Sequence, residues 1–577
     1  MSAPGSRSSL GRGAIIAIGL FSLLGGCART TEIVGRLVRD GGGGGGDVDA
    51  AVDAVDASVD APPPALTCGD HCYRAAGVTA DPSAFDATPV VDPARQPALV
   101  YPLAGAVVPV NLGTFTLQWR RASAAQSSFR VRFAGPGLVF DLLLPCDGAG
   151  AVAKPATVPA EACLFALPPD LFATIAGPAT GKTLSVAITA LESGRPPVAS
   201  VPANLEFSVA PVGGGLYFWS RKTLGISRAL IGSLAAADFV PGSAAPVARF
   251  GCVGCHAVSR DGSTLALDAE SDGYASDGNL VVTSTATPMT PTIPAPATPM
   301  RNAATMAVSP NGRLVLVSAG PTGDSGHAVV KETATGAVVA TLDGAALAGT
   351  GGTGVYFPEW SPAGDELVAT VARVAPRPFS VSDGSIVVWH FDGVNFGPPD
   401  VLVAGNGGES HYAPTWSPSG KYIAFITGEV GAGISSYLNP RSRLRIIARS
   451  SGVGGAVDLI QATQNPAVGV GWPHFAPFGE GDGARFYLTF ESHIDYGYLR
   501  RNTAEANRGL SQLWLTAIDM TRLNQGIDPS RPPVWLPFQD PNFSNLMGVW
   551  AERLVCGPQS PCDPGMVCTD SQCLVAH

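Results

Sequence analysis

Trp416-Ser417-Pro418-Ser419-Gly420 leads directly into the apolar stretch Tyr422-Ile423-Ala424-Phe425. Proline and glycine in this order are typical of a tight turn, and a short apolar run after a turn is typical of a buried β-strand. The same unit recurs at Ser259-Arg260-Asp261-Gly262, Ser309-Pro310-Asn311-Gly312, Trp360-Ser361-Pro362-Ala363-Gly364 and, more weakly, Phe475-Ala476-Pro477-Phe478-Gly479. This repeated turn and strand therefore predicts how the second half of the chain folds.

The spacing of these copies indicates their architecture. The turn serines, with Ala476 in the last copy, lie 50, 52, 56 and 59 positions apart. A repeat of this period, with several strands in each unit, is typical of a β-propeller whose blades pack on one another. We expect a propeller over residues 212–553, with six blades and seven as the alternative. Tyr217-Phe218-Trp219-Ser220 is expected to open the first blade.

These turn-and-strand copies resemble the WD40-like repeats of the TolB propeller. The resemblance covers the same residues, 212–553, and it implies a fold but no single function, because propellers serve as enzymes, scaffolds and receptors. Some peptidases combine a propeller with a hydrolase domain that carries a G-x-S-x-G motif. This motif does not occur in the sequence, which argues against a hydrolase of that type.

The region before the propeller also predicts β-structure. Residues 97–211 contain four stretches in which apolar and polar residues alternate: Thr114–Arg120, Phe129–Phe133, Leu184–Ile188 and Leu205–Val209. Alternating strands separated by glycine and proline favour an immunoglobulin- or fibronectin-type sandwich. The expected fold class is therefore all-β: a sandwich, then a propeller, then a disulfide-rich tail over residues 554–577.

Composition supports this class and excludes one kind of partner. Charged residues make up 14% of the chain, below the ~25% of an average soluble protein, while the sequence contains 70 glycines and 50 prolines. Such a chain favours short strands joined by turns over a helical bundle. The net charge is −10 and no basic run is present, so nucleic acid is not an expected partner.

The first 66 residues predict export and a membrane anchor. Arg7 and Arg12 precede the apolar run Ala14–Leu24, which has the length of a signal-peptide core. The run ends in Leu24-Gly25-Gly26-Cys27, which resembles a bacterial lipobox, and this resemblance implies lipidation of Cys27. An ordinary signal peptide with a chance cysteine is the alternative. Residues 28–66 are rich in glycine, aspartate and proline and predict a flexible tether, so the expected location is the cell envelope, at the outer membrane or on a periplasmic or cell-surface face.

The cysteines predict an oxidising compartment. Of eleven cysteines, one is assigned to lipid and two to the motif described next. The other eight are disulfide candidates: Cys68, Cys72, Cys146, Cys163, Cys556, Cys562, Cys568 and Cys573. Cys68 can pair with Cys72 within the small segment 67–96, and Cys146 with Cys163. Two bridges are expected in the tail, whose three possible connectivities stay open.

Cys252-Val253-Gly254-Cys255-His256 is the motif that carries chemistry. C-x-x-C-H is the attachment pattern of a c-type haem, in which two thiols bind the porphyrin and the histidine binds the iron. The expected cofactor is one covalent haem, held by Cys252 and Cys255, with His256 as the proximal iron ligand. A zinc site lacks further nearby ligands, and a thioredoxin-type pair lacks its βαβ setting. A Cys252–Cys255 disulfide is the main alternative, and an even cysteine count does not exclude it.

The region resembles exported bacterial propeller proteins that carry one C-x-x-C-H ahead of their repeats. It lacks the helical domain that usually encloses such a haem, so the propeller itself has to supply the distal ligand. His411 and His474 come at comparable inner strands and could face a common space, and Met300 and Met306 lie near the motif in sequence. A five-coordinate iron without a distal ligand is the alternative.

Three functional hypotheses follow. The first is a lipid-anchored haem protein that acts in electron transfer or redox sensing with a partner in the envelope. The second is a non-catalytic, TolB-like scaffold that binds protein or glycan and contains a Cys252–Cys255 disulfide. The third is a peroxidase-like haem enzyme, which requires acid–base residues at an open distal site. No catalytic residue is predicted from the sequence.

Overall fold

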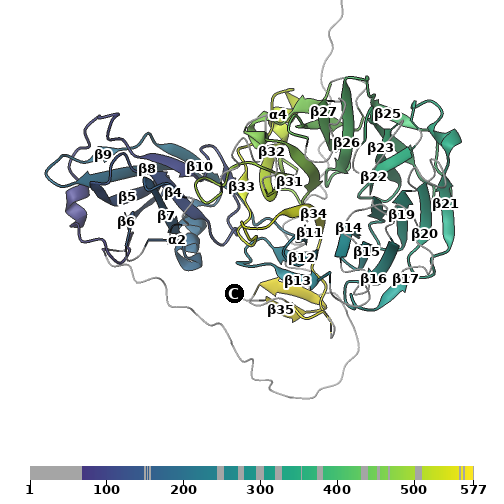
Figure 1. The fold of residues 1–577 in the computed structure, drawn as a ribbon, viewed down its shortest axis with the longest axis horizontal. Helices are drawn as coiled ribbons and strands as arrows, with labels where there is room; N and C mark the ends of the chain where they lie inside the picture. The colour runs from purple at the N-terminus through teal and green to yellow at the C-terminus, as the bar shows by residue number, and fades with distance from the viewer. Residues whose placement is uncertain are drawn as a thin grey trace, which may run out of the picture. The chain divides into compact units, whose positions relative to one another are not determined.

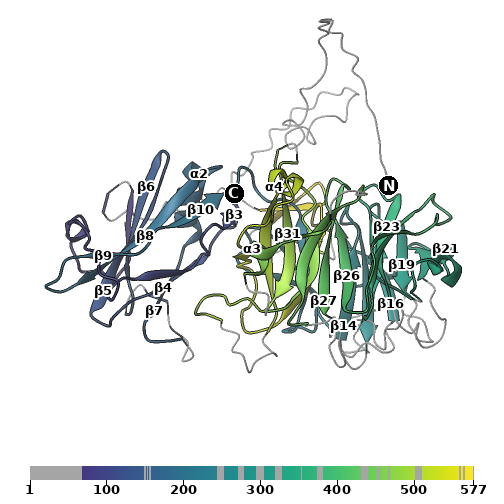
Figure 2. The same ribbon diagram turned by 90° about the horizontal axis from the view of Figure 1, so that it is seen from above.

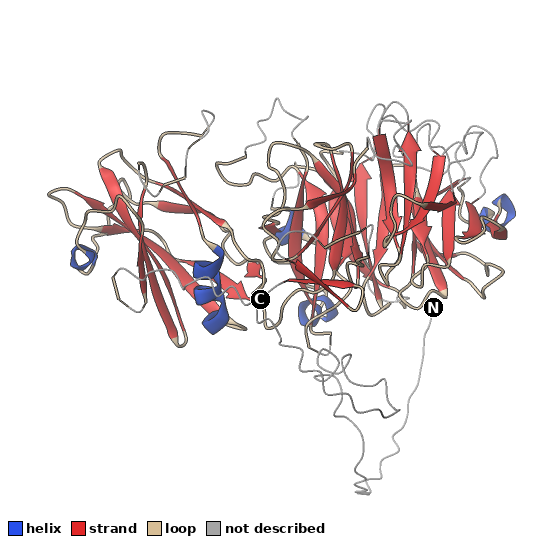
Figure 3. Ribbon diagram, turned by 90° about the horizontal axis from the view of Figure 1, so that it is seen from below, coloured by secondary structure: helices blue, strands red, loops and turns tan. Residues whose placement is uncertain are grey.

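The computed structural model describes residues 68–575 except 70, 149–150, 153, 155–157, 243–251, 271–278, 294–304, 319–327, 353, 373–380, 430–438, 451–454, 465–467, 482, 501–509, 558–559 and 563–565. The expected signal peptide, Cys27, the tether and Met300 lie outside the described residues. All described residues belong to one compact unit, Ser58–His577. Strands dominate its regular structure (Figure 3), so the fold is mostly β, as predicted.

Two sheets form the region before the propeller. The larger has seven strands in the order β1-β6-β5-β8-β10-β3, with β9 beside β8, and the smaller has the order β2-β4-β7. The strands of the larger sheet are β1 (Cys72–Arg74), β3 (Val107–Val108), β5 (Gln126–Gly135), β6 (Leu138–Pro145), β8 (Thr183–Glu192), β9 (Val198–Ala199) and β10 (Ala203–Phe207). Those of the smaller sheet are β2 (Ala98–Tyr101), β4 (Thr116–Arg120) and β7 (Ala162–Ala166).

The larger sheet differs from the antiparallel sheets of an immunoglobulin-type sandwich. Strand β1 pairs with β6 in parallel, and β10 pairs with β3 in parallel, so the sheet is mixed. The helix α2 (Pro169–Ala179) also lies between β7 and β8 in the chain, and the short 3₁₀ helix η1 (Pro82–Phe85) precedes β2. Alternation of apolar and polar residues predicted the central strands, but it contains no information on which way the edge strands run.

Six four-stranded antiparallel sheets follow within the described residues, and we number them as blades 1 to 6. Blade 1 contains β11 (Gly215–Ser220), β12 (Gly225–Leu230), β13 (Ala237–Val240) and β34 (Asn545–Ala551). Blade 2 contains β14 (Cys252–Val258), β15 (Thr264–Glu270), β16 (Asn279–Ser284) and β17 (Pro291–Ile293). Blade 3 contains β18 (Met306–Val308), β19 (Leu314–Ser318), β20 (Ala328–Glu332) and β21 (Val338–Leu342). Blade 4 contains β22 (Gly354–Trp360), β23 (Glu366–Ala372), β24 (Ser385–His390) and β25 (Asp400–Val403). Blade 5 contains β26 (Glu409–Trp416), β27 (Tyr422–Glu429), β28 (Arg443–Ala448) and β29 (Val457–Asp458). Blade 6 contains β30 (Val470–Phe475), β31 (Arg485–Ser492), β32 (Gln512–Asp519) and β33 (Val534–Trp535). The blades follow one another around a ring (Figure 1), and their strands lie side by side in the second view (Figure 2).

Blade 1 closes the ring with strands from both ends of the propeller. Its order is β13-β12-β11-β34, so three strands from the start of the propeller pair with one from its end. Strand β34 also contacts β14 of blade 2 and β30 of blade 6, which places it at the inner edge of its sheet. The last strand therefore joins blade 1 to both of its neighbours.

The repeated turn has a local physical basis. The hydroxyl of Ser417 accepts a hydrogen bond of 3.1 Å from the backbone N–H of Tyr422, and Ser361 does the same for Glu366 at 3.0 Å. Gly420 has a φ of +69°, a conformation that glycine adopts at little cost. The serine and the glycine together fix the reversal between the inner strand of a blade and the next, which explains why the sequence repeats them.

The tail forms a two-stranded sheet of β35 (Met566–Thr569) and β36 (Gln572–Val575). It packs against blades 1 and 2, because Cys556 and Cys573 share a buried cluster with Tyr217 of blade 1 and with Val253 and Leu265 of blade 2. The remaining helices are short: η2 (Gly344–Leu347), α3 (Ile460–Thr463) and α4 (Met520–Asn524). None of the helices in the described part of the chain is long and apolar enough to cross a membrane.

Candidate functional site

The inner strands of blades 2 to 6 can be aligned by counting residues back from the turn serine, or from Ala476 in blade 6. The third residue before the turn serine, or before Ala476, is His256, Met306, Pro358, Pro414 or Pro473 in blades 2 to 6. The second residue before it is Ala257, Ala307, Glu359, Thr415 or His474. Blades 2 and 3 therefore present a histidine and a methionine beside alanines, whereas blades 4 to 6 present prolines beside polar side chains.

These positions meet at a cavity in the middle of the propeller. The cavity has a volume of about 130 Å³ and is lined by inner strands of all six blades. Its wall contains several side chains that can bind a metal, namely Cys255, His256, Met306, His474 and Met547. Tryptophans line much of the rest, namely Trp360, Trp416, Trp472 and Trp550. The cavity therefore combines nitrogen and sulfur donors with an apolar wall.

The C-x-x-C-H motif lies on β14, the inner strand of blade 2. Its pairing with β15 shifts register between Val253, which faces Ala269, and His256, which faces Leu267. Such a bulge places two residues opposite one and changes the direction of the side chains. Cys255 and His256 both line the cavity although they are consecutive, which a regular strand does not allow. The side chain of Cys252 lies outside the described residues.

His256 is buried, and its ring makes no well-aligned hydrogen bond. Only 4% of its surface is exposed, and neither ring nitrogen has an aligned hydrogen-bond partner among the described residues. Burial lowers the pKa of His256 from 6.5 to about 4; a loosely aligned hydrogen-bonding contact with the backbone of Tyr217 partly opposes this, and the imidazole of His474 adds to it. The imidazole is therefore neutral at pH 7, the form that binds a metal ion. A buried polar group with no partner costs free energy, so this position requires an explanation.

His474 lies on another wall of the same cavity. Its Nδ1 is 3.3 Å from Oε2 of Glu359 on β22. The other carboxylate oxygen, Oε1, accepts hydrogen bonds of 3.1 Å from both the hydroxyl of Thr415 and the backbone N–H of Trp416. Glu359 is therefore held by blade 5 while it contacts a histidine of blade 6. No pattern in the sequence distinguishes Glu359, because a lone glutamate in a strand is usually solvated.

His411 does not share this cavity. It is 3% exposed, its Nδ1 is 2.9 Å from the hydroxyl of Thr427, and its ring meets Phe425 edge-on at 5.8 Å. Burial also lowers the pKa of His411. It is absent from the residues that line the cavity, so the expectation that His411 and His474 face a common space is wrong for His411. Its contacts explain it as a structural histidine.

The methionine candidates also differ in whether they line the cavity. Met306 is 7% exposed and lines the cavity in the blade next to His256. Met300 lies outside the described residues. Met547 on β34 also lines the cavity, although nothing in the sequence distinguished it from the other methionines. Its position follows from the closure of blade 1, which joins residues more than 300 positions apart.

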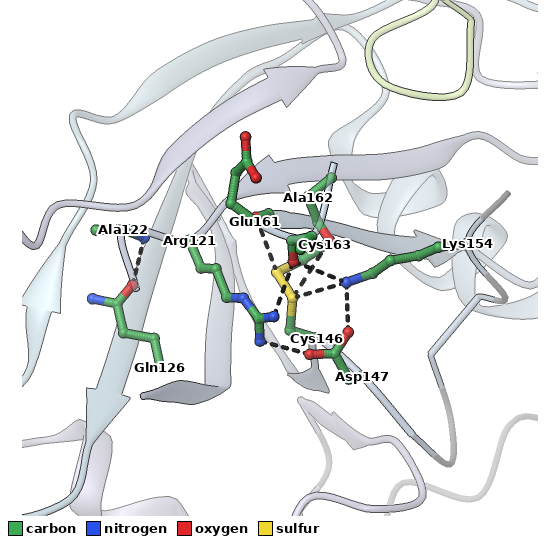
Figure 4. The surroundings of a disulfide bond; sticks show 10 residues. Arg121, Ala122, Gln126, Cys146, Asp147, Lys154, Glu161, Ala162 and Cys163 are labelled. Carbon is green, nitrogen blue, oxygen red and sulfur yellow. Dashed lines mark hydrogen bonds and ion pairs between the residues drawn. A yellow bond between two sulfur atoms is a disulfide. The ribbon is translucent and has the colours of Figure 1, made fainter. Parts of the chain in front are cut away.

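Disulfides account for the eight remaining cysteines. Cys68 pairs with Cys72 and Cys146 with Cys163, the pairs that the spacing indicated. In the tail Cys556 pairs with Cys568 and Cys562 with Cys573, one of the three open connectivities. Figure 4 shows the second bridge beside an ion pair of 2.6 Å between Arg121 and Asp147. These bridges lie away from the cavity and staple the segments that contain them.

Comparisons with known proteins concern the fold alone. No protein-family model matches the chain, and no curated protein matches it. Among solved structures, TolB from Acinetobacter baumannii is 11% identical with a TM-score of 0.37, over 64% of this chain and 79% of that one. A candidate TolB from Agrobacterium tumefaciens is 14% identical with a TM-score of 0.33, over 60% and 95%. The propeller domain of the Trilobed protease from Pyrococcus furiosus is 12% identical with a TM-score of 0.28, over 58% and 79%. Likeness at this level does not extend to activity.

Proposed function

We propose that this protein carries one covalent haem on blade 2 and acts in electron transfer or redox sensing at the cell envelope. Cys252 and Cys255 would hold the porphyrin, and His256 would bind the iron. Lipid on Cys27 would anchor the chain, and the tether 28–66 would separate the folded part from the membrane. The N-terminal sheets, which we interpret as a modified immunoglobulin-type sandwich, would act as a spacer.

One observation supports this proposal above the others: the state of His256. The imidazole is buried and neutral, has no aligned hydrogen-bond partner among the described residues, and lines a cavity beside Cys255. A structural histidine, such as His411, uses a ring nitrogen for a hydrogen bond. A metal ion bound to His256 would satisfy the nitrogen that is otherwise left without a partner.

The donor types, two thiols and an imidazole, are those that attach a c-type haem. Each thiol would add across one vinyl group, so that sulfur bonds to one carbon and the thiol hydrogen passes to the other, without any oxidant. A Cys252–Cys255 disulfide would have to be reduced first. The cavity of about 130 Å³ is smaller than a porphyrin, so the side chains around it must rearrange on attachment. Haem bound in this way supplies reversible one-electron chemistry at its iron.

The chain's own residues would set the conditions for that chemistry. Because burial keeps His256 neutral, no proton has to leave before its nitrogen can bind iron. The tryptophan side chains around the cavity would give the haem a partly apolar setting, which is one of the means by which a protein tunes a haem.

The test is an optical spectrum of the full-length protein, oxidised and reduced, after production with the cytochrome c maturation machinery. We expect a haem spectrum in the wild type and in His390→Ala, a control that removes an exposed histidine. The double variant Cys252→Ala and Cys255→Ala should lose it. A wild type without haem absorption would favour the scaffold with a Cys252–Cys255 disulfide that binds protein or glycan.

A further inference from the structure

We propose that the central cavity, before any haem is attached, binds a small organic cation that carries a quaternary ammonium group. The carboxylate of Glu359 lies against the charge of this ligand, and tryptophan and phenylalanine rings surround its methyl groups. The inference goes beyond the proposed function, because it concerns the wall that blades 4 to 6 and β34 contribute, and it does not need the C-x-x-C-H motif. It gives a role to Glu359 and to the aromatic side chains of that wall.

The size of the cavity limits the ligand. Its volume is about 130 Å³. An engineered apolar cavity of about 150 Å³ in another protein binds benzene, and a trimethylammonium group is smaller than benzene. The ligand is therefore a small cation, or a small head group at the end of a longer molecule.

Bulges in two inner strands place aromatic rings on the cavity wall. Phe357 in β22 and Trp472 in β30 each lie within a register shift of their strand, and their φ values are +50° and +43°. A left-handed backbone is uncommon for bulky residues, and such strained residues cluster at ligand-binding sites. Both side chains line the cavity, and their ring centroids are 5.1 Å apart with the planes at 70°. Two blades therefore accept backbone strain where they present a ring to the cavity.

Two further tryptophans are held by their indole N–H groups. The Nε1 of Trp416 donates to the backbone carbonyl of Glu359 at 3.3 Å, and the Nε1 of Trp550 donates to the hydroxyl of Thr489 at 2.9 Å. Both side chains line the cavity. Because their polar atoms are engaged within the protein, the aromatic rings are what they offer to a ligand, and the face of an indole ring attracts a cation.

The charges on the wall favour a cation. Among the described residues that line the cavity, Glu359 is the only acidic one and Arg260 the only lysine or arginine. The guanidinium of Arg260 donates hydrogen bonds of 2.8 Å to Oε1 of Glu552 and to the carbonyl of Pro477, so its charge is already paired. Oε2 of Glu359 is buried and accepts no aligned hydrogen bond from the described residues, although Nδ1 of His474 is 3.3 Å away. The negative charge of Glu359 is therefore available to a bound cation.

The wall fits a quaternary ammonium better than a primary one. Oε1 of Glu359 accepts hydrogen bonds of 3.1 Å from the hydroxyl of Thr415 and from the backbone N–H of Trp416, so the carboxylate is fixed before a ligand arrives. A primary ammonium group has three N–H donors, and each needs an acceptor when it leaves water. The wall provides one carboxylate among tryptophan, proline and alanine side chains. A quaternary ammonium has no N–H donor, and aromatic faces and one opposite charge are enough to hold it.

The same wall is not arranged for a bare metal ion. Such an ion takes several side-chain donors at about 2.0–2.3 Å, so the donor atoms must converge. Among the described residues, the three His, Cys or acidic donors that lie within 4.8 Å of one another are Cys556, Cys562 and Cys573 in the tail, where disulfides occupy them. The cavity therefore suits an organic cation.

The test is titration calorimetry of the full-length protein, produced without haem maturation, at about pH 8, above the usual titration range of histidine. The probes are choline, glycerophosphocholine and the neutral alcohol in which carbon replaces the nitrogen of choline. We expect choline to bind roughly tenfold more tightly than the alcohol, because a desolvated cation gains about this much from aromatic faces. Tighter binding of choline than of glycerophosphocholine indicates a free cation, and the reverse indicates a lipid head group. If neither cation binds more tightly than the alcohol, the proposal is overturned.

Two variants locate the ligand in the cavity. Glu359→Gln keeps the shape of the side chain without its charge, and Trp472→Leu removes one ring from the wall. Each should reduce the preference for choline over the alcohol by roughly tenfold. This preference is a ratio measured within one variant, so a general loss of stability does not imitate the effect.

Matched controls remove the same chemistry elsewhere. Glu429→Gln removes an exposed carboxylate that pairs with Arg441, and Phe478→Leu removes a ring that is 46% exposed; neither residue lines the cavity. Both controls should keep the preference of the wild type. An unchanged preference in Glu359→Gln, or an equal loss in Glu429→Gln, overturns the assignment to Glu359.

This inference and the proposed function fail separately. Cation binding is measured on the chain without haem, whereas haem attachment is measured by intact mass after maturation. A chain that carries haem but shows no preference for choline overturns the cation site alone. A chain that binds choline but gains no haem mass overturns the proposed function alone.

Discussion

Strand β14 of blade 2 and strand β26 of blade 5 each carry a buried histidine, His256 and His411. His411 has a hydroxyl partner and an aromatic neighbour, and it lies away from the central cavity. His256 has no aligned partner among the described residues and lines that cavity beside Cys255. Burial alone therefore does not mark a functional histidine. The informative difference is whether the surrounding protein already satisfies the ring.

The largest effect is expected when each of these two histidines is replaced by alanine in turn. His256→Ala removes the proposed iron ligand, so the reduced low-spin haem spectrum should be lost. His411→Ala should keep the spectrum and lower the free energy of unfolding by about 1–3 kcal/mol, because it leaves the Thr427 hydroxyl without its partner. Spectra and urea unfolding of both variants check this. Equal loss of the spectrum in both would erase the distinction between the two strands.

The second prediction concerns the contact between blade 1 and the tail, whose Cys556 and Cys573 share a buried cluster with Val253 of β14. The guanidinium of Arg228 on β12 is 2% exposed and donates to the carbonyls of Val555 and Pro561 at 3.2 and 2.7 Å, and to the hydroxyl of Ser560 at 3.0 Å. Arg228→Met should lower the free energy of unfolding by about 3 kcal/mol, because hydrogen bonds to charged groups are strong and the acceptors stay buried. Hydrogen exchange should increase in β14 and remain unchanged in β26, and equal increases would contradict a local role.

A smaller effect is expected from the bridge between Cys562 and Cys573. These residues are 11 positions apart, and closing a loop of this length lowers the entropy of the unfolded chain, which raises the free energy of unfolding by about 2–3 kcal/mol. Replacing both with alanine should lower the melting temperature and increase exchange in blade 2 more than in blade 5. Calorimetry and hydrogen exchange measure the two effects. An unchanged melting temperature would mean that the tail contributes nothing to the propeller.

The smallest effect is the change in the free energy of unfolding per pH unit. Burial raises the pKa of Glu491 on β31 from 4.5 to about 8, which the backbone N–H of Met547 only partly opposes. The folded protein therefore keeps a proton that the unfolded chain releases, so stability should fall as pH rises from about 5 to 8. The expected slope is about 1 kcal/mol per pH unit or less. Glu491→Gln cannot titrate and should lack this contribution to the slope in urea unfolding; an identical slope would show that Glu491 is ionised in the folded state.

Local features of the fold could be predicted from the sequence. The turn serines and glycines were visible because a hydroxyl acceptor and a positive φ are requirements of a few neighbouring residues. Closure of blade 1 by β34 was not, since its pairing with β11 joins residues far apart in the chain. The parallel edges of the N-terminal sheet were missed for the same reason.

The surroundings of the candidate histidines could not be predicted, because the face on which a strand residue lies depends on bulges. The register of β26 shifts between Tyr412 and Thr415, so His411 lies before its bulge. In β30 the shift falls between Gly471 and His474, so His474 lies after it. A bulge reverses the face of the sheet on which later residues lie, and the sequence pattern does not indicate where a bulge occurs. His411 lies six residues before its turn serine and His474 two residues before Ala476, so the two histidines occupy different positions of the repeat and have different surroundings.

The most direct measurement of the central claim is the intact mass of the full-length protein under denaturing conditions, after production with haem maturation. A haem held by two thioether bonds survives denaturation, so the mass should exceed that of polypeptide and lipid by one haem. The excess should disappear when Cys252 and Cys255 are both replaced by alanine. A wild-type mass equal to polypeptide and lipid alone would contradict the account.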